Sequence, residues 1–405
     1  MRHVIIGGSI AGISAARSIR SCSRDAEIIM ISAESSKPYY RPLISSVIEK
    51  RDADLAFDGH TLETANIRTL HDQAMGIDAR SKVVLLSSGR HMSYDKLLIA
   101  TGSSPLIPDV PGIQGAGVFP LRTIEDARTI QAVACNRKHA AVLGGGFVGI
   151  KAAIALKSLG LQVTIIEKLD RILYEKLDRR GAAIVADLLK RQDIDIVTNQ
   201  TDYEINRVGM TVRSIRLASG RIIDADLIIV AVGTQPNTGS FVGSGIKINK
   251  GIVVQDSLET NVADVFAAGD VVEFRDVVSN TRAVSTSWSN AEDMGRLAGK
   301  NMAGGNIKYT GFLALMNTIN ILNVPISTIG LVEPESDNCE VFTEGSEHSY
   351  RKLVFRNDVM VGALFIGQAE EPEIYTCLIR KQVPLGDLKE HAVRGSLEKL
   401  YQGIS

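Results

Sequence analysis

The stretch Val4-Ile5-Ile6-Gly7-Gly8-Ser9-Ile10-Ala11-Gly12 decides the fold, because it places a glycine turn between an apolar strand and a helix that begins with small residues. Glycine allows positive φ and a close approach of the backbone to a ligand. Backbone N–H groups at a helix N-terminus bind a diphosphate well, since the helix dipole favours negative charge there. We therefore predict strand, turn, helix over about 11–20 and a second strand over 27–32.

A second stretch, Ala141-Val142-Leu143-Gly144-Gly145-Gly146-Phe147-Val148-Gly149, has the same form. It carries the full Gly-x-Gly-x-x-Gly pattern, whereas the first stretch has Ser9 at the middle position. A helix over about 149–159 and a strand over 162–167 are expected to follow. Two such units leave little room for the alternative that these are glycine turns with no ligand.

An acidic residue stands at the end of the second strand of each unit. Glu34 closely follows the first and Glu167 closes the second. A carboxylate at this place accepts hydrogen bonds from the ribose hydroxyls of a dinucleotide. Glu167 would also repel a 2′-phosphate, so the sequence favours NAD over NADP, a preference that the adjacent Lys168 weakens.

Further landmarks show that the whole unit is repeated. Gly89, Asp95 and Gly102 each have a counterpart 131 positions later, at Gly220, Asp226 and Gly233. Because these residues recur in the same order, they imply two copies of one unit. The order strand, helix, strand in each copy implies a parallel sheet with right-handed crossovers.

We predict an α/β protein with two Rossmann-like dinucleotide-binding domains and a small C-terminal α+β domain. The first domain is discontinuous, over residues 1–110 and 242–309, and the second covers 111–241. The third, 310–405, has strand-like runs at 324–331, 352–355 and 361–365 and then a charged helix over about 385–401.

Composition excludes several other classes. There are 45 Lys plus Arg and 46 Asp plus Glu, and the net charge of −1 argues against a nucleic-acid-binding protein. The four cysteines form no close pair, so we expect no metal site and no disulfide framework, and a cytoplasmic location. The apolar run at 4–6 ends in glycines without a cleavage site, and 311–332 contains three Asn and a Pro, so neither a signal peptide nor a membrane span is expected.

The two units, the strand ends Ala100-Thr101-Gly102 and Ala231-Val232-Gly233, and the run Val265-Phe266-Ala267-Ala268-Gly269-Asp270 together resemble the FAD-dependent pyridine nucleotide–disulfide reductase-like flavoproteins over about residues 1–310. The segment Lys37-Pro38-Tyr39-Tyr40-Arg41-Pro42-Leu43-Ile44-Ser45 is similar to that of rubredoxin and ferredoxin reductases and of the flavoprotein part of assimilatory nitrite reductase.

The resemblance implies FAD in the first domain and NAD in the second. Gly269 and Asp270 would hold the ribityl chain and inner phosphate of FAD, and Trp288 would lie beside the flavin ring. Arg122 matches an arginine that contacts FAD in the family, and the alternative is a surface residue at the start of a helix. For Trp288 the alternative is an ordinary core residue. The candidate cofactor-binding residues are Gly7, Ser9, Ala11, Gly12, Glu34, Arg41, Pro42, Ala74, Ala100, Thr101, Gly102, Arg122, Gly144, Gly146, Phe147, Val148, Gly149, Glu167, Gly233, Gly269, Asp270 and Trp288.

The chain departs from the family at three places. Residues 39–50 contain no cysteine, which argues against a thiol relay and against reduction of disulfides. Ser46 stands where rubredoxin- and ferredoxin-type reductases often carry Lys, and Lys151 where most relatives carry Glu. Ser46 and Lys151 are therefore the candidate catalytic positions. A solvent-exposed lysine is the simpler interpretation of Lys151; the hypothesis is that it stabilises an anionic reduced flavin or binds an acidic partner.

The leading interpretation is an NADH-dependent flavoprotein that receives a hydride at flavin N5 and passes electrons directly to a rubredoxin- or ferredoxin-type carrier. One alternative is an NADH oxidase or peroxidase that uses O₂ or H₂O₂. Another is an NADH-sensing flavoprotein with little turnover. A homodimer is possible under each interpretation.

Overall fold

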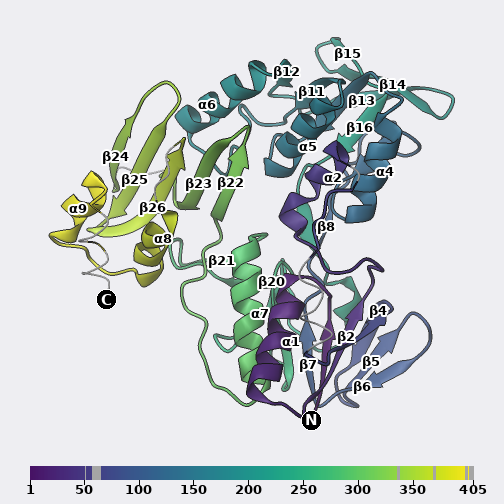
Figure 1. Cartoon of the computed structure of the whole chain (residues 1–405), viewed down its shortest axis with the longest axis vertical. Helices are drawn as coiled ribbons and strands as arrows, with labels where there is room; N and C mark the ends of the chain where they lie inside the picture. The colour runs from purple at the N-terminus through teal and green to yellow at the C-terminus, as the bar shows by residue number, and fades with distance from the viewer. Residues whose placement is uncertain (51, 57–64, 335–337, 368–370, 397–399, 401–405) are drawn as a thin grey trace.

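The first domain is built on a five-stranded parallel sheet in the order β19-β7-β1-β2-β3. The computed structural model describes residues 1–50, 52–56, 65–334, 338–367, 371–396 and 400. Strands β1, β2, β7 and β19 are mostly apolar and buried, as expected for the strands of a parallel sheet, whereas the edge strand β3 is polar and largely exposed. Their bounds are β1 Arg2–Ile6, β2 Glu27–Ser32, β3 Arg68–His71, β7 Lys96–Ile99 and β19 Val265–Ala267, with α1 Ile10–Cys22 and α7 Trp288–Met302 packed together beside the sheet (Figure 1).

The middle domain repeats this arrangement and confirms the repeat. Its parallel sheet has the order β12-β11-β10-β16-β9, and the helix and strand after its glycine turn lie within two residues of their predicted positions. The elements are β9 Val118–Pro120, α4 Ile124–Ala134, β10 His139–Leu143, α5 Phe147–Ser158, β11 Gln162–Ile166, α6 Arg179–Lys190, β12 Ile194–Val197 and β16 Leu227–Val230.

Each copy also inserts a three-stranded antiparallel sheet at the same point of the repeat. These are β4 Ala74–Asp78, β5 Val83–Leu86 and β6 His91–Ser93, and β13 Tyr203–Val208, β14 Thr211–Leu217 and β15 Ile222–Asp224. A third small sheet belongs to the first domain and contains β18 Ile252–Val253, β20 Val272–Arg275 and β21 Arg282–Val284.

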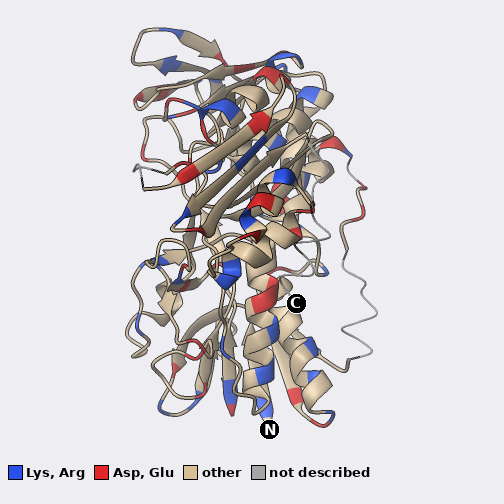
Figure 2. Ribbon diagram, turned by 90° about the vertical axis from the view of Figure 1, so that its left-hand side faces the viewer, with Lys and Arg blue, Asp and Glu red and all other residues tan. Residues whose placement is uncertain are grey.

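The C-terminal domain is an antiparallel sheet in the order β22-β23-β26-β25-β24 with α8 packed on it. The elements are β22 Met316–Ile321, β23 Val324–Gly330, β24 Glu340–Gly345, β25 Tyr350–Arg356, β26 Val359–Ile366, α8 Pro372–Lys381 and α9 Leu388–Arg394. Basic and acidic residues are interspersed on this side of the molecule (Figure 2). In the described residues, no helix has the length and apolar character needed to cross a bilayer.

The helix expected over 385–401 is interrupted, since Leu400 is helical again with its backbone nitrogen 3.4 Å from the carbonyl oxygen of Ser396. Its first part is α9. It begins at Leu388 and ends at Arg394, because Gly395 follows with φ of +68° and closes it as a left-handed C-cap. Residues 397–399 and 401 of the expected helix lie outside the described residues. The sequence analysis missed α8, which begins with Pro372 in its first turn.

The first and middle domains are joined by two chain crossings that pair with each other. β8 (Ser103–Pro105) carries the chain into the middle domain and β17 (Thr234–Pro236) brings it back, and the two form an antiparallel ribbon. A short segment of the first domain, η1 (Arg41–Leu43) and α2 (Ser45–Glu49), instead packs on α4 and α5 of the middle domain. The two crossing strands and the packed segment η1–α2 therefore hold the first and middle domains together.

Helices α1 and α7 approach so closely that glycine is required between them. A Cβ at Gly295 would stand 2.1 Å from the carbonyl oxygen of Ala11, and one at Gly299 would stand 2.4 Å from that of Ala15. Since α1 begins at the first glycine turn, this contact also fixes the turn.

Gly295→Ala is expected to destabilise the protein by about 1–3 kcal/mol, because the added methyl group overpacks the α1–α7 contact. The midpoint of thermal unfolding should fall by several degrees. Gly239→Ala is the control, since a Cβ there meets no atom within 4 Å. Equal midpoints for the two variants would contradict the steric argument.

Candidate functional site

The two glycine turns hold a backbone that a side chain would block. Gly7 and Gly144 have φ of +122° and +103°. A Cβ would stand 2.1 Å from the carbonyl oxygen of Ala100 at the first position and 2.4 Å from that of Ala231 at the second. Each turn is thus pressed against the end of the neighbouring parallel strand, and its first glycine has the positive φ that the sequence predicted.

Some of the remaining positions in each turn allow the helix to pack closely, and the others face open space. A Cβ at Gly12 or Gly149 would lie 2.0 Å from the carbonyl oxygen of the first glycine of its own turn, so these residues allow the helix to pack on the turn. A Cβ at Gly146, the N-cap of α5, meets no atom within 4 Å. Ser9, the N-cap of α1, makes no side-chain capping bond. Both middle positions leave the helix N-terminus open to a ligand.

A cavity of about 2650 Å³ joins the two turns and is lined by all three domains. Pockets for one small ligand usually measure about 300–1000 Å³, so this space has room for two dinucleotides. The predicted site residues that line it are Gly7, Ser9, Ala11, Glu34, Arg41, Pro42, Ala74, Ala100, Thr101, Gly102, Arg122, Gly144, Gly146, Phe147, Val148, Lys151, Glu167, Gly233, Gly269, Asp270 and Trp288. Gly12, Gly149 and Ser46 are not brought to the cavity wall.

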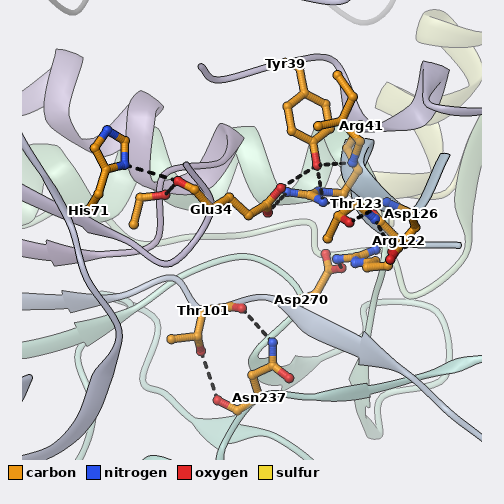
Figure 3. A network of polar contacts seen from close by, with 12 residues as sticks. Glu34, Tyr39, Arg41, His71, Thr101, Arg122, Thr123, Asp126, Asn237 and Asp270 are labelled. Atoms are coloured by element: carbon orange, nitrogen blue, oxygen red, sulfur yellow. Dashed lines mark hydrogen bonds and ion pairs between the residues drawn. The ribbon is translucent and has the colours of Figure 1, made fainter. Parts of the chain in front are cut away.

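The carboxylate of Glu34 accepts hydrogen bonds from two side chains of segment 37–45, the segment that resembles rubredoxin and ferredoxin reductases (Figure 3). Arg41 Nη2 donates to Glu34 Oε1 at 2.5 Å, and the Tyr39 hydroxyl donates to Oε2 at 2.6 Å. Each carboxylate oxygen keeps a second lone pair. The acid predicted to bind ribose hydroxyls therefore also fixes the position of Arg41 in the cavity wall.

This network continues into the middle domain. The Tyr39 hydroxyl accepts from the backbone N–H of Ile124 at 3.1 Å, and Arg41 Nη1 donates to the carbonyl oxygen of Arg122 at 2.8 Å (Figure 3). Burial raises the pKa of Tyr39 well above its usual range, so the phenol stays protonated. The sequence analysis did not anticipate this connection, because it depends on side chains more than 80 residues apart.

Asp270 is oriented by two donors and keeps one oxygen for a ligand. Arg122 Nη2 and the Ser103 hydroxyl both donate to its Oδ2 at 2.9 Å. Within the described part of the chain, Oδ1 accepts no hydrogen bond. The Asp270 carboxylate thus fits the predicted role of holding hydroxyl groups of FAD. Arg122 is not a surface residue, since its side chain is 23% exposed and pairs with Asp270.

The start of α4 sets the direction of Arg122. Thr123 is the N-cap and accepts from the N–H of Asp126 at 3.1 Å. Asp126 in return accepts from the N–H groups of Thr123 and Arg122 at 2.8 and 2.9 Å. This capping box, visible in the sequence as Thr-x-x-Asp, was not used as a signal.

The two crossing strands are locked beside the cavity by reciprocal hydrogen bonds. The Thr101 hydroxyl donates to the carbonyl oxygen of Asn237, and Asn237 Nδ2 donates to that of Thr101, both at 2.9 Å (Figure 3). Ser104 donates to Asn237 Oδ1 at 2.7 Å. Thr101 therefore acts on the ribbon as well as on the cavity wall.

Glu167 is bound to the second glycine turn. Its Oε2 accepts from the N–H of Gly145 at 2.6 Å, and its Oε1 accepts from that of Leu169 at 2.8 Å. Lys168 is exposed and lines the cavity beside it. Glu167 is thus fixed beside the second glycine turn, and its role in ribose binding stays a prediction.

The two candidate catalytic positions differ in their placement. Lys151 is half-buried against α2 and lines the cavity, with its ammonium 3.4 Å from the carbonyl oxygen of Pro42. Burial lowers its pKa, and the charge of Glu49 partly opposes that shift. Lys151 is therefore not the solvent-exposed lysine of the simpler interpretation. Ser46 donates to the carbonyl oxygen of Leu43 in its own turn, so we assign it no role.

Trp288 stands at the start of α7 and is half-buried, so it is not a plain core residue. Its ring lies beside that of Tyr40, with centroids 5.8 Å apart and planes tilted by 35°. Tyr40 is 43% exposed, and both residues line the cavity. The pair thus connects the cavity with the molecular surface.

The C-terminal domain contributes a wall that the sequence analysis missed. One face of α8 lines the cavity through polar residues that recur at helical spacing, namely Glu373, Thr376, Cys377 and Arg380. Arg380 also pairs with Asp293 of α7 at 3.3 Å. The spacing of these residues was a usable signal, but their direction toward the cavity depends on how the domains pack.

A buried ion pair fastens this domain to the middle one. Asp178, the N-cap of α6, accepts at Oδ2 from Lys352 and from the Tyr350 hydroxyl, each at 2.8 Å, and at Oδ1 from the N–H of Gly181. The Lys352 and Asp178 side chains are only 10% and 9% exposed. No local pattern in the sequence predicted this pair.

Comparison with known proteins agrees with the geometry. Residues 1–295 match the model of the pyridine nucleotide-disulphide oxidoreductase family, and 316–383 match the rubredoxin NAD+ reductase C-terminal domain. The chain is 32% identical to an NADH oxidase of Methanocaldococcus jannaschii over 82% of this chain and 75% of the relative. A solved NADH:rubredoxin oxidoreductase of Clostridium acetobutylicum has a TM-score of 0.77 at 28% identity, covering 95% of this chain and 96% of that one.

Other relatives are longer. A nitrite reductase [NAD(P)H] of Bacillus subtilis is 29% identical over 96% of this chain, but the chain spans only 48% of it. The chain likewise covers only 51% of an assimilatory nitrate reductase electron transfer subunit of the same organism. The matched domains, the paired glycine turns and the shared cavity lead to one conclusion: the chain belongs to the pyridine nucleotide-disulphide oxidoreductase family and carries a C-terminal domain of the rubredoxin NAD+ reductase type.

Proposed function

We propose that this protein is an NADH-dependent flavin oxidoreductase that passes electrons directly to a small carrier protein of the rubredoxin or ferredoxin type. The observation that carries the proposal is the single cavity that contains both glycine turns, because hydride transfer requires two cofactors in near contact. Members of the family use FAD and NAD(H). When bound, FAD supplies the chemistry, taking a hydride and releasing single electrons.

In this proposal, the residues of the chain bind and orient FAD and NADH. In the first domain, the turn at Gly7 and Ser9 binds the FAD diphosphate, and the available oxygen of Asp270 accepts hydrogen bonds from hydroxyl groups of FAD. In the middle domain, the open N-terminus at Gly146 binds the NADH diphosphate and Glu167 binds the ribose. These assignments follow from the open helix termini and the placed carboxylates described above.

Three observations support a carrier protein as the acceptor. Residues 39–50 contain no cysteine to relay electrons through sulfur. The C-terminal domain matches that of rubredoxin NAD+ reductase. The Tyr40–Trp288 pair leads from the cavity to the surface. The cytoplasmic location predicted from the sequence belongs to this proposal.

Anaerobic stopped-flow spectroscopy tests the proposal. Purified yellow protein is bleached with NADH and then mixed with rubredoxin, ferredoxin, or buffer containing O₂ or H₂O₂. Rapid return of the flavin absorbance with a carrier supports the proposal. Return with O₂ alone identifies an oxidase instead, and no return with any acceptor together with an NADH-linked change in oligomer size identifies a sensor.

The oxidase is a second candidate because of one specific observation. The relative at 32% identity is named an NADH oxidase. Rapid O₂ consumption at low NADH concentration, together with slow carrier reduction, would favour this candidate.

Cys377→Ser is expected to leave the rate of electron transfer to the carrier unchanged. Cys377 lines the cavity from α8, so its thiol is the one to test for a sulfur relay. The measurement is the same stopped-flow reoxidation. A fall of tenfold or more, with flavin content unchanged, would show that electrons do pass through sulfur.

Lys151→Met is expected to make the bound flavin harder to reduce. The half-buried ammonium lies in the cavity and forms no ion pair within the described residues, so it favours negative charge on the reduced flavin. We expect at least a tenfold shift in the reduction equilibrium, about 30 mV for a two-electron couple. The measurement is a spectroelectrochemical titration of the flavin.

The control is Lys157→Met, which removes the same charge from α5 without touching the cavity wall. Lys151→Arg should retain the potential, and Lys151→Glu should shift it further than methionine does. An unchanged potential in Lys151→Glu would refute the hypothesis.

A further inference from the structure

Lys176 is fixed between the second glycine turn and the C-terminal domain. Its backbone N–H donates to the carbonyl oxygen of Leu173 at 2.8 Å, and the N–H of Leu173 donates to that of Gly145 inside the turn at 2.9 Å. From the other side, the hydroxyl of Thr328 on β23 donates to the carbonyl oxygen of Lys176 at 2.6 Å. The backbone that carries this side chain is therefore held against the turn.

Among the residues that the structure describes, none pairs with the ammonium group of Lys176. The residue is half-buried and lines the cavity, yet within the described residues its side chain makes no hydrogen bond or ion pair. Burial lowers its pKa, and the charge of Glu175 partly opposes this shift.

Neighbouring cations of this region are paired: Arg171 with Asp170 and Glu333, and Lys352 with Asp178. A partly buried cation is costly unless it is paired. An unpaired ammonium on the wall of the cavity that also contains the open N-terminus of α5 is an arrangement that an anion completes.

We infer that Lys176 binds a phosphate group of the pyridine dinucleotide, an inference that rests on the proposed function. Two phosphates are chemically equivalent candidates: the diphosphate, which NADH and NADPH share, and the 2′-phosphate, which only NADPH carries. The hydrogen bonds that tie residues 173–176 to Gly145 favour the diphosphate. Lys168, exposed beside Glu167, is the cation better placed for a 2′-phosphate.

The assignment gives the C-terminal domain a part in nucleotide binding. Through Thr328 it holds the Lys176 backbone, although it carries no glycine turn of its own. The sequence analysis did not single out Lys176, because its position nine residues after Glu167 belongs to no pattern that we used.

The test compares dissociation constants of NAD⁺ and NADP⁺ for the full-length flavoprotein, measured by titration calorimetry at several salt concentrations. Lys176→Met is expected to weaken both dinucleotides at least tenfold and to reduce the dependence of binding on salt. Lys176→Arg should retain most of the affinity. Lys190→Met, at the exposed end of α6, is the control and should bind both as the parent does.

Folding is checked separately by flavin content and thermal unfolding. Because Lys176 has no partner to lose, the ligand-free Lys176→Met protein should unfold at the same or a higher temperature than the parent. A loss confined to NADP⁺ would support phosphate binding and identify the 2′-phosphate as its source. Unchanged constants for both dinucleotides would overturn the inference.

Failure of the Lys176 inference can be told apart from failure of the proposed function. A parent protein that binds NAD⁺ but delivers electrons to no acceptor refutes the proposed function and leaves the Lys176 assignment standing. A parent protein that binds neither dinucleotide refutes both.

Discussion

Asp178→Ala is expected to lower the free energy of unfolding by about 3–5 kcal/mol, because it leaves a buried ammonium between the middle and C-terminal domains without its partner. The Lys352 side chain is 10% exposed, and its ammonium donates to Asp178 Oδ2 at 2.8 Å. The same change removes the acceptor of the Tyr350 hydroxyl and the N-cap of α6. Urea unfolding followed by far-UV circular dichroism should show a lower midpoint.

The ion pair between Arg191 and Glu347 is a matched control, since it joins the same two domains but is 48% and 78% exposed. Exposed pairs contribute less than about 1 kcal/mol, so Arg191→Met should change the midpoint little. The double variant Asp178→Ala, Lys352→Met should recover part of the loss, because no uncompensated charge remains. Equal effects of Asp178→Ala and Arg191→Met would contradict the account.

The same ion pair predicts a dependence on pH. Burial raises the pKa of Asp178, but the hydrogen bonds from Lys352, Gly181 and Tyr350 outweigh it and hold the pKa below the usual value. A depressed carboxylate pKa contributes stability above the ordinary aspartate pKa, and that stability is lost as the pH falls below it. The difference in midpoint between the parent and Asp178→Ala should therefore shrink in acid.

Gly144→Ala and Gly146→Ala are expected to separate packing from ligand approach at the second turn. Gly144 has positive φ, and its Cβ would stand 2.4 Å from a backbone oxygen, so alanine should destabilise the turn and abolish NAD⁺ binding. Gly146 has ordinary φ and open space, so alanine should leave ligand-free stability unchanged. NAD⁺ affinity should nevertheless fall at least tenfold, because the methyl group occupies space that the diphosphate needs.

Both variants should keep their flavin, since the first turn is unchanged. Thermal unfolding without ligand and calorimetry with NAD⁺ are the two measurements. Full NAD⁺ affinity in Gly146→Ala would show that the diphosphate does not approach α5 at this residue.

The sequence predicted what local patterns determine. The glycine spacings and the apolar strands near Val4 and Val142 depend on neighbouring residues, and the structure confirms the elements there within two residues. The last helix was predicted as continuous because charged residues after Gly395 continue a helical pattern, whereas the left-handed conformation of that glycine ends α9 before the helical residue Leu400.

Contacts between distant residues could not be predicted in this way. Asp178 and Lys352 are 174 positions apart, and neither lies in a recognisable motif. The burial of Lys151 depends on α2, a segment of the first domain that crosses to the middle one. Tyr39 and Arg41 stood in a segment whose likeness to known reductases was visible, but the direction of their side chains toward Glu34 required the fold.

The paired strands β8 and β17 have a consequence for engineering. Because the chain enters and leaves the middle domain side by side, that domain is an insertion with adjoining ends, the geometry in which whole modules are exchanged between proteins. We propose that residues 111–241, the predicted middle domain, form such an exchangeable module. A grafted homologous module of different coenzyme preference would have to keep Arg122, because that residue pairs with Asp270 of the flavin half.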